Sequence, residues 1–433
     1  MKTRNITLIC FASLFLKAEA QLRFTSVNEV QQFALEHNQE NKIQKLKTLE
    51  AKENRNLSNA FLYPNITGSF NGQYNIDISE TPVPGDLMGK PGATIYMKFG
   101  KEYTYNAGIN VSYNILNWSS VYQSKISKVN IQLAEANSIY TKQQLKEQAG
   151  QIYYATITAQ RAEEIWKQNK LIADTIEQIT LQKFRDGLVD LLAVNQAKIN
   201  TNQVSQQVQK TSLYAQQCVN QLKMLLAIDE KTDLQLTEKL DTGKLEILPV
   251  TILPDSHTEI LKYQQKISEY EMKSSLAAFA PQISFKGYFG ANQFWNSLDF
   301  SFNKQDWHLS NYVGLSISIP IFAGFANKSK YNAAKIEKQI AQIAYYEEIT
   351  NNALKDNILS KNYFTSISVV NSSLEKVRLS KENMRLAEQK YNQGLINLTD
   401  YLETFNTNLS IQNQYLTDLS EYLSIKSTIE SRK

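Results

Sequence analysis

The sequence predicts a mainly α-helical protein with a membrane β-barrel contribution, built from very long antiparallel coiled-coil helices and four β-strands per chain. Two stretches long enough for helices of ~100 Å hold almost no glycine or proline. Four other segments alternate between apolar and polar residues, as strands that cross a membrane do. An internal repeat indicates that the chain carries this arrangement twice.

The amino-terminal residues 1–20 have the pattern of a secretory signal. Lys2 and Arg4 give a positive start, residues 6–16 form a short apolar run, and Ala18-Glu19-Ala20 is a small-x-small cleavage site. An ordinary buried apolar segment is the alternative interpretation. No cysteine follows the cleavage site, so no lipid anchor is expected there.

Charge and cysteine content narrow the function classes. Removing the signal takes away three cations and one anion, which lowers the net charge from +4 to about +2. Such a balanced chain gives no indication of a nucleic-acid partner. Cys218 is then the single cysteine, so an intramolecular disulfide is impossible. No later apolar run reaches the ~18 residues of a membrane helix, so any membrane crossing would use strands.

The expected helices follow from where proline and glycine are absent. No proline lies in residues 92–248 or 321–433, and Gly150 is the only glycine of residues 119–186. A coiled-coil seam is visible as steps of three and four at Ile126, Val129, Leu133, Ala136 and Tyr140. A first helix is expected from Ser26, with Glu29 as its capping-box partner, to about Phe61.

Three matched segments reveal the repeat: residues 60–67 with 277–284, 108–112 with 314–318, and 183–188 with 390–395. The domain prediction is a first repeat over 21–226, an equatorial linker over 227–255 and a second repeat over 256–433. Each repeat would contain a helix, a β-hairpin and a long helix pair. The hairpins are expected at about 65–116 and 282–321, and the helix pairs turn at Gly187 and Gly394.

Four segments change to the period of two that marks a strand. Their apolar rows are Ile66, Phe70, Tyr74 and Ile76; Tyr105, Ala107, Ile109, Val111 and Tyr113; Ile283, Phe285 and Phe289; and Val313, Leu315, Ile317 and Ile319. Long proline- and glycine-rich loops are expected around residues 81–100 and 297–305. A pair of hairpins on a soluble core is the alternative, but the uncharged polar rows and the nearby aromatic residues Tyr96, Tyr103, Trp295 and Trp307 favour a membrane.

Four strands cannot close a membrane barrel, because a spanning sheet must leave no edge in lipid and closed barrels need about eight strands or more. Several chains must therefore share one barrel. Three copies would give a trimer with a 12-stranded barrel and room for a lumen. The long helices would continue the assembly as a tube.

The chain resembles the TolC-like outer-membrane efflux proteins. The resemblance rests on the signal, the two-fold repeat, the Phe61-x-x-Pro64 entry to the first hairpin, the segment 319–324 (Ile-Pro-Ile-Phe-Ala-Gly) after the second hairpin, and the pattern Tyr391-x-x-Gly394-Leu395. It covers essentially the whole mature chain. It implies a homotrimer in the outer-membrane lipid with a large periplasmic α-barrel, serving a periplasmic adaptor protein and an inner-membrane transporter in efflux or type I secretion.

The resemblance also implies functional sites. The adaptor-docking tips would be Gly187, Leu188 and Val189 in the first repeat and Gly394, Leu395 and Ile396 in the second. The gate at the periplasmic aperture would be formed by Asp400, Glu403 and Tyr391. Carboxylates gathered round a three-fold axis would make a cation-binding constriction. The plainer alternative is that Asp400 is a helix N-cap and Glu403 its capping-box partner.

The sequence departs from the family pattern at the gate. Ala193 occupies the position that matches Asp400 in the first repeat, with Asp190 three residues earlier. Ile396 stands where some relatives carry a basic latch residue. The resemblance therefore does not extend to a salt-bridge latch.

Catalytic patterns are missing from the sequence. The histidines His37, His257 and His308 lie at no metal-ligand spacing, and there is no phosphate-binding glycine loop or Gly-x-Ser-x-Gly elbow. We expect no enzyme activity, no cofactor and no metal. A secreted coiled-coil scaffold or adhesin without a pore is the second hypothesis, and an envelope hydrolase is the third.

Overall fold

The computed structural model describes residues 22–238, 243–247 and 249–433. The expected signal, residues 1–20, lies outside these described residues. The chain divides into two compact units. The first unit comprises Met1–Leu46, Ala136–Thr258 and Glu348–Lys433, and the second comprises Lys47–Glu135 and Glu259–Glu347.

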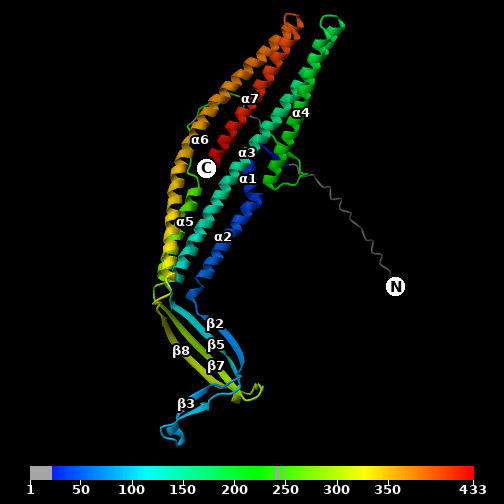
Figure 1. Cartoon of the computed structure of the whole chain (residues 1–433). Helices are drawn as coiled ribbons and strands as arrows, with labels where there is room; N and C mark the ends of the chain where they lie inside the picture. The colour runs from blue at the N-terminus through cyan, green and yellow to red at the C-terminus, as the bar shows by residue number, and fades with distance from the viewer. Residues whose placement is uncertain (1–21, 239–242, 248) are drawn as a thin grey trace, which may run out of the picture. The chain divides into compact units, whose positions relative to one another are not determined.

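Two very long helices are the main elements, α3 (Trp118–Arg185, 68 residues) and α6 (Ala326–Asn392, 67 residues). At ~1.5 Å per residue each is ~100 Å long. Each reverses through a short turn into an antiparallel partner, α4 (Leu191–Leu226) after α3 and α7 (Leu398–Ser431) after α6 (Figure 1). The predicted long helix pairs are therefore confirmed. Within the described residues, no helix is both long and apolar enough to cross a bilayer.

In the first unit the helices pack through buried apolar side chains, among which Tyr153, Leu222, Ile367 and Phe405 are fully buried. At Gly150 the α3 backbone lies close to a side chain of α7. A Cβ atom at Gly150 would lie 1.9 Å from the Ser427 Oγ. The single glycine of α3 is therefore required by packing and does not break the helix.

The first predicted helix is interrupted. It begins where Ser26 caps it, as predicted, but α1 (Val27–His37) stops at Asn38 and α2 (Gln39–Ser58) follows. Asn38 has an extended ψ of 134°. Its side-chain amide donates to the Leu225 carbonyl at 2.9 Å. The expectation of one helix to about Phe61 was wrong because this tertiary hydrogen bond outweighs helix propensity.

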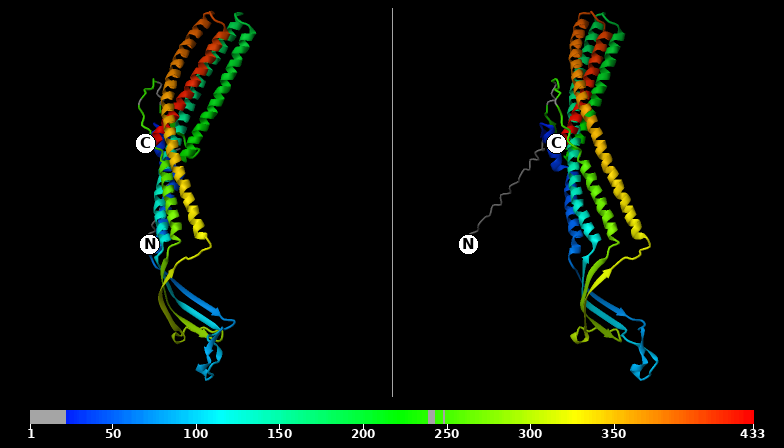
Figure 2. Two further views of the ribbon diagram at one scale, coloured as in Figure 1. Left: turned by 60° about the vertical axis from the view of Figure 1, so that its left-hand side comes forward. Right: turned by 90° about the vertical axis from the view of Figure 1, so that its left-hand side faces the viewer.

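The second unit contains one four-stranded sheet (Figure 2). Its strands are β2 (Asn65–Tyr74), β5 (Tyr103–Leu116), β7 (Gln282–Trp295) and β8 (His308–Ser318), in the order β2-β5-β7-β8. All neighbours pair antiparallel, so the four predicted strands are confirmed. The two edge strands β2 and β8 consequently run in opposite directions.

The register assigns each residue to one of two faces. One row across the sheet joins Ile66 with Val111, Val111 with Gly287, and Gly287 with Val313. We call this side the apolar face. The opposite side, the polar face, carries asparagine, serine and threonine, for example Asn110 hydrogen-bonded to Ser69 at 2.9 Å. The alternation read from the sequence thus persists across all four strands.

The connections of the sheet contain more structure than expected. The predicted loop around residues 81–100 folds into a hairpin of β3 (Glu80–Pro84) and β4 (Thr94–Lys98) with the 3₁₀ turn Gly85–Met88 between them. The β7–β8 connection is shorter. It folds back over the apolar face, where the Phe300 ring meets the Phe70 and Tyr105 rings at 5.8 and 5.2 Å.

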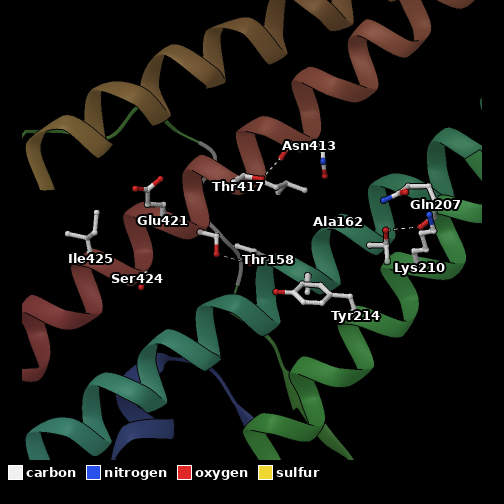
Figure 3. Close-up of a pocket in the computed structure, with 14 residues that line it drawn as sticks. Thr158, Ala162, Gln207, Lys210, Tyr214, Asn413, Thr417, Glu421, Ser424 and Ile425 are labelled. Carbon is white, nitrogen blue, oxygen red and sulfur yellow. Dashed lines mark hydrogen bonds between the residues drawn. The ribbon is translucent and has the colours of Figure 1, made fainter. Parts of the chain in front are cut away.

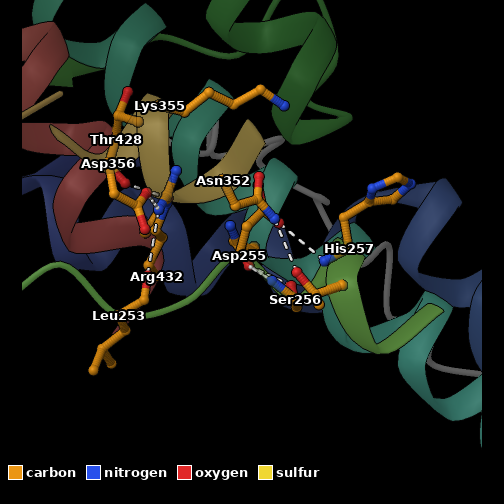
Figure 4. Close-up of polar contacts among 12 residues, drawn as sticks. Leu253, Asp255, Ser256, His257, Asn352, Lys355, Asp356, Thr428 and Arg432 are labelled. Carbon is orange, nitrogen blue, oxygen red and sulfur yellow. Dashed lines mark hydrogen bonds and ion pairs between the residues drawn. The ribbon is translucent and has the colours of Figure 1, made fainter. Parts of the chain in front are cut away.

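The region after α4 lies in the first unit. Strand β6 (Leu234–Leu236) pairs parallel with β1 (Leu22–Phe24), and the predicted linker 227–255 lies only partly within the described residues. Its end is held by Arg432, whose guanidinium donates to Asp356 at 2.6 Å and to the Leu253 carbonyl at 3.3 Å (Figure 4). Helix α5 (His257–Ala277) follows.

Candidate functional site

The first unit ends in two helix-to-helix turns, which together we call the tip. In the α3–α4 turn Gly187 has φ +73°, its N–H donates to the Phe184 carbonyl at 3.0 Å, and the Leu188 N–H donates to the Lys183 carbonyl at 2.8 Å. This is a Schellman motif, which needs a left-handed residue after the helix end. Gly394 in the α6–α7 turn has the same φ and the equivalent hydrogen bonds.

Each tip turn also caps the helix that follows it. The Asp190 carboxylate accepts from the Ala193 N–H at 2.9 Å, and the Asn397 side chain accepts from the Asp400 N–H at 2.8 Å. Asn397 is therefore the N-cap of α7. The plainer interpretation of Asp400 as an N-cap was wrong, because Asp400 lies in the first turn of the helix with its carboxylate uncommitted to capping.

The structure places Asp400 and Glu403 on the exposed side of α7, less than one turn apart. Both line a groove of about 650 Å³ between α6 and α7. Lys376 and Lys390 of α6 line the same groove. Among the described residues, neither lysine forms an ion pair with Asp400 or Glu403. The two positive and two negative formal charges nevertheless balance. The formal net charge of the residues that line this groove is therefore zero.

Tyr391 lies in the interior of the tip. Its side chain is 2% exposed, and its hydroxyl shares a hydrogen bond of 3.2 Å with Thr180 of α3. The ring stacks on Tyr401 of α7, with centroids 5.0 Å apart. Tyr391 thus joins three helices, and burial of this kind indicates that it positions the tip while Asp400 and Glu403 face solvent.

The Lys183 side chain of α3 packs over the Tyr391 ring. Its ammonium lies 3.8 Å from the centre of the Tyr391 ring and donates to the Tyr391 carbonyl at 2.8 Å. Desolvation lowers the pKa of Lys183. The ammonium is therefore a second donor to the Tyr391 carbonyl, which also accepts from the Gly394 N–H at 3.1 Å. This carbonyl lies at the carboxyl end of α6, where the helix dipole favours a cation.

The predicted docking residues differ in exposure. Leu188 and Leu395 are 71% and 68% exposed, whereas Val189 and Ile396 are half-buried. Leu191 and Leu192, at the start of α4, are also more than half exposed. The sequence analysis did not select these two, although the run Leu188-Val189-Asp190-Leu191-Leu192 is more apolar than a solvated turn requires.

A second groove, of about 680 Å³, lies between α3, α4 and α7, away from the tip (Figure 3). Its lining includes six residues with hydroxyl groups: Thr158, Thr211, Tyr214, Thr417, Ser420 and Ser424. Lys210 and Glu421 supply one charge of each sign. A groove of this composition can be hydrated.

The three histidines lie in separate places in the structure. His257 Nδ1 lies 3.1 Å from a Glu348 carboxylate oxygen, and its ring lies 5.1 Å from that of Tyr140. His37 stacks on Phe33, and His308 lies in β8 beside Phe294. Among the described residues, no three His, Cys, Asp or Glu side chains gather in a way that could hold a metal ion.

Comparison with known proteins gives matches over most of the chain. A family model described as "Outer membrane efflux protein" matches residues 30–227 and 262–431. A curated relative, the probable outer membrane lipoprotein SilC of Salmonella typhimurium, is 24% identical over 333 residues, which cover 75% of this chain and 67% of the relative.

Solved structures match the fold. A membrane protein from Pseudomonas aeruginosa has a TM-score of 0.77 at 17% identity, covering 94% of this chain and 93% of that chain. The CmeC outer membrane channel of Campylobacter jejuni has a TM-score of 0.76 at 18% identity, covering 100% of this chain and 93% of that chain. Both halves of the chain, including the strands and the long helix pairs, are therefore part of a known architecture.

Proposed function

Because the chain belongs to the outer membrane efflux protein family, we propose that three copies assemble into one continuous, passive exit duct. Members of this family are outer-membrane channels of efflux systems, not enzymes, and the chain is such a channel. The proposal adds the assembly: a 12-stranded barrel in the outer membrane and a tube of long helices in the periplasm. An inner-membrane transporter would supply the energy and a periplasmic adaptor would connect the two.

The edges of the sheet are the observation that carries this proposal. β2 and β8 each pair on one side only among the described residues, and they run in opposite directions. An unpaired edge is costly in lipid, where no water can satisfy its N–H and C=O groups. The β8 edge of one copy can pair antiparallel with the β2 edge of the next, so the same contact repeated three times closes the barrel.

The two faces of the sheet support a water-filled lumen. Large apolar side chains on the apolar face are well exposed, for example Phe70 at 59% and Leu315 at 70%. Lipid would cover this face in a membrane. The polar face would then line the lumen, where its hydroxyl and amide groups remain hydrated.

Exposed apolar rows on the helices support contacts between copies. In the first unit, α4 exposes Ile199 and Leu213, which lie fourteen residues, or two heptads, apart. In the second unit, α6 exposes Ile336, Ile340 and Ile343, spaced by four and three. Rows with this spacing are typical of coiled-coil seams. A neighbouring copy is the partner that a closed tube of helices would provide.

The tip is the proposed docking site for the adaptor. Leu188, Leu191, Leu192 and Leu395 present exposed apolar side chains on two rigid, capped turns. Val189 and Ile396 are half-buried beside these leucines. Gly187 and Gly394 adopt the left-handed conformation that lets the chain reverse direction. An adaptor with an apolar surface of matching shape could bury these leucines without reshaping the turns.

The aperture is the proposed gate. Asp400 and Glu403 of three copies would surround the axis at the closed end of the tube and attract divalent cations. Lys376 and Lys390 in the same groove reduce this effect, so the attraction is weaker than carboxylates alone would give. Tyr391 would act as a positioning residue that fixes the start of α7.

Single-channel recording tests both parts of the proposal. The detergent-purified protein should insert into planar bilayers as a stable pore, and a divalent cation added on the tip side should reduce its current. Asp400→Asn combined with Glu403→Gln should raise the half-blocking concentration by about tenfold. Asp190→Asn is the matched control, because asparagine also caps a helix and the carboxylate it removes belongs to the same tip.

Two results would contradict the proposal. Unchanged block in the double variant would remove Asp400 and Glu403 from the gate. Recovery of the chain without detergent as a soluble monomer with no conductance would instead support the coiled-coil scaffold hypothesis and remove the duct.

A further inference from the structure

The polar face of the sheet carries one isolated cation, so the expectation of wholly uncharged polar rows was wrong at one position. Across β2, β5, β7 and β8, all within the described residues, Lys286 is the only lysine, arginine, aspartate or glutamate. Its Cα partners are Ser112 on one side and Gly314 on the other, which places it in a row of the polar face. Lys286 is exposed, and none of the described carboxylates forms an ion pair with it.

The surroundings of Lys286 are held in a fixed arrangement. Two residues further along β7, the Tyr288 side chain lies against Gly108 and Gly290, where an added Cβ would come within 2.7 Å of its ring. Tyr312 lies beside it, with ring centroids 5.9 Å apart. No side chain fills the space at Gly314, where a Cβ would meet nothing within 4 Å. Lys286 therefore has open space on its Gly314 side, and Tyr288 and Tyr312 occupy the next row of the polar face.

From these observations we propose that Lys286 forms a ring of ammonium groups that binds multivalent oxyanions in the barrel lumen. The inference rests on the proposed trimeric duct and goes beyond it, because it assigns the barrel section the opposite charge preference to that of the aperture. Cargo with phosphate-type or other clustered negative charge would be favoured at this level of the duct.

The geometry of a shared barrel brings the three cations within range of one another. Twelve strands ~4.8 Å apart and tilted by ~40° give a backbone radius of about 12 Å. A lysine side chain reaching ~6 Å inward leaves the ammonium groups about 10 Å apart. This spacing is comparable to the Debye length of ~8 Å, so the fields overlap at the axis. The expected enrichment of a monovalent anion there is about fivefold, and more for a polyanion.

Charges at the outer end of the barrel are too far away to cancel this effect. The β7–β8 connection carries Asp299, Asp306 and Lys304. The strand from Lys286 to Trp295 alone spans ~30 Å, which is several Debye lengths. The loop charges and Lys286 therefore act on a permeating ion independently.

Block by inorganic tripolyphosphate, added on the barrel side of planar bilayers, tests the inference. The wild-type channel should be blocked reversibly, and raising the salt concentration should weaken the block. Lys286→Gln should raise the half-blocking concentration at least tenfold, whereas Lys286→Arg should keep it within about twofold. Ser112→Lys, which adds a cation beside Lys286, should lower it. Lys304→Gln is the matched control and should leave it unchanged.

Each outcome separates this inference from the proposed function. If the protein forms channels that tripolyphosphate does not block, or if Lys286→Gln and Lys304→Gln behave alike, the ammonium ring is overturned while the duct stands. If Lys286→Gln does not assemble, the Ser112→Lys channel decides, because unchanged block there would also overturn the ring. A wild-type protein that forms no channel contradicts the duct itself.

Discussion

The Tyr391 ring stacks on the Tyr401 ring at the tip, with an interplanar angle of 19° and centroids 5.0 Å apart. The contact joins the end of α6 to the first turn of α7. It thereby fixes the direction in which α7 leaves the turn, and with it the position of the carboxylates that follow.

We expect Tyr391→Ala to loosen the tip. Removing a fully buried aromatic ring costs about 3–5 kcal/mol, and here the Lys183 ammonium would also lose the ring beneath it. Hydrogen exchange should accelerate from α6 residue 384 to α7 residue 405, with little change in the sheet. Tyr391→Phe removes only the hydroxyl bonded to Thr180 and should cost about 1 kcal/mol. Equal exchange in both variants would contradict the role of ring packing.

Gly394 should resist replacement for reasons of backbone conformation alone. Its φ is +73°, and an added Cβ would meet nothing within 4 Å. Gly394→Ala should therefore destabilise the tip by about 1–2 kcal/mol, measured by hydrogen exchange of the turn. Gly394→Asn should recover part of this loss, because asparagine tolerates the left-handed conformation. No difference between alanine and asparagine would show that conformation is not the cause.

Gly108 should be coupled to Tyr288 in the sheet. A Cβ at Gly108 would lie 2.7 Å from the Tyr288 ring. Gly108→Ala should reduce the yield of heat-resistant oligomer on denaturing gels, because the ring must move. Tyr288→Ala in the same chain should restore assembly, since it removes the obstruction. If the double variant assembles no better than Gly108→Ala, the close contact is not what the glycine serves.

Tyr422, in the helical unit, should make the protein sensitive to alkali. Burial, the neighbouring Tyr363 and Glu430 raise the pKa of Tyr422 from its ordinary value of 10 to about 12. A raised pKa means that the stabilisation is complete below pH 10 and is lost as the pH rises through 12. Urea unfolding at several pH values should show this decline. Tyr422→Phe should make the decline shallower but not remove it, because burial also raises the pKa of Tyr153, Tyr154 and Tyr401. An unchanged slope would exclude Tyr422 as a source.

Much of the fold follows from the sequence because its signals are periodic and long. Alternation over whole strands predicted the four strands, and long stretches with almost no glycine or proline predicted the helix pairs. Single tertiary hydrogen bonds could not be predicted, which explains the missed break at Asn38. The same limit applies to the α7 cap: Asn397 and Asp400 are both good caps in sequence, and only the backbone decides between them.

The positions of the two tip turns were predictable. The turn glycines were located because a reversal between two helices needs a left-handed residue. Burial of Tyr391 was not visible, since its partners Thr180 and Tyr401 lie on other helices. The β3–β4 hairpin was not predicted because β3 contains Pro82 and Pro84, and proline normally argues against a strand.

Disulfide trapping between the edge strands tests the central claim most directly. In a chain lacking Cys218, Ser69→Cys on β2 would be combined in turn with cysteines at Ser310, Ser316 and Ser318 on β8, all on the polar face. Within one chain β2 and β8 are separated by two strands, ~14 Å at ~4.8 Å per step, too far for a disulfide whose Cβ atoms lie ~4 Å apart. At least one pair should give covalent trimers in oxidised outer membranes. Monomers from every pair would contradict a barrel shared between chains.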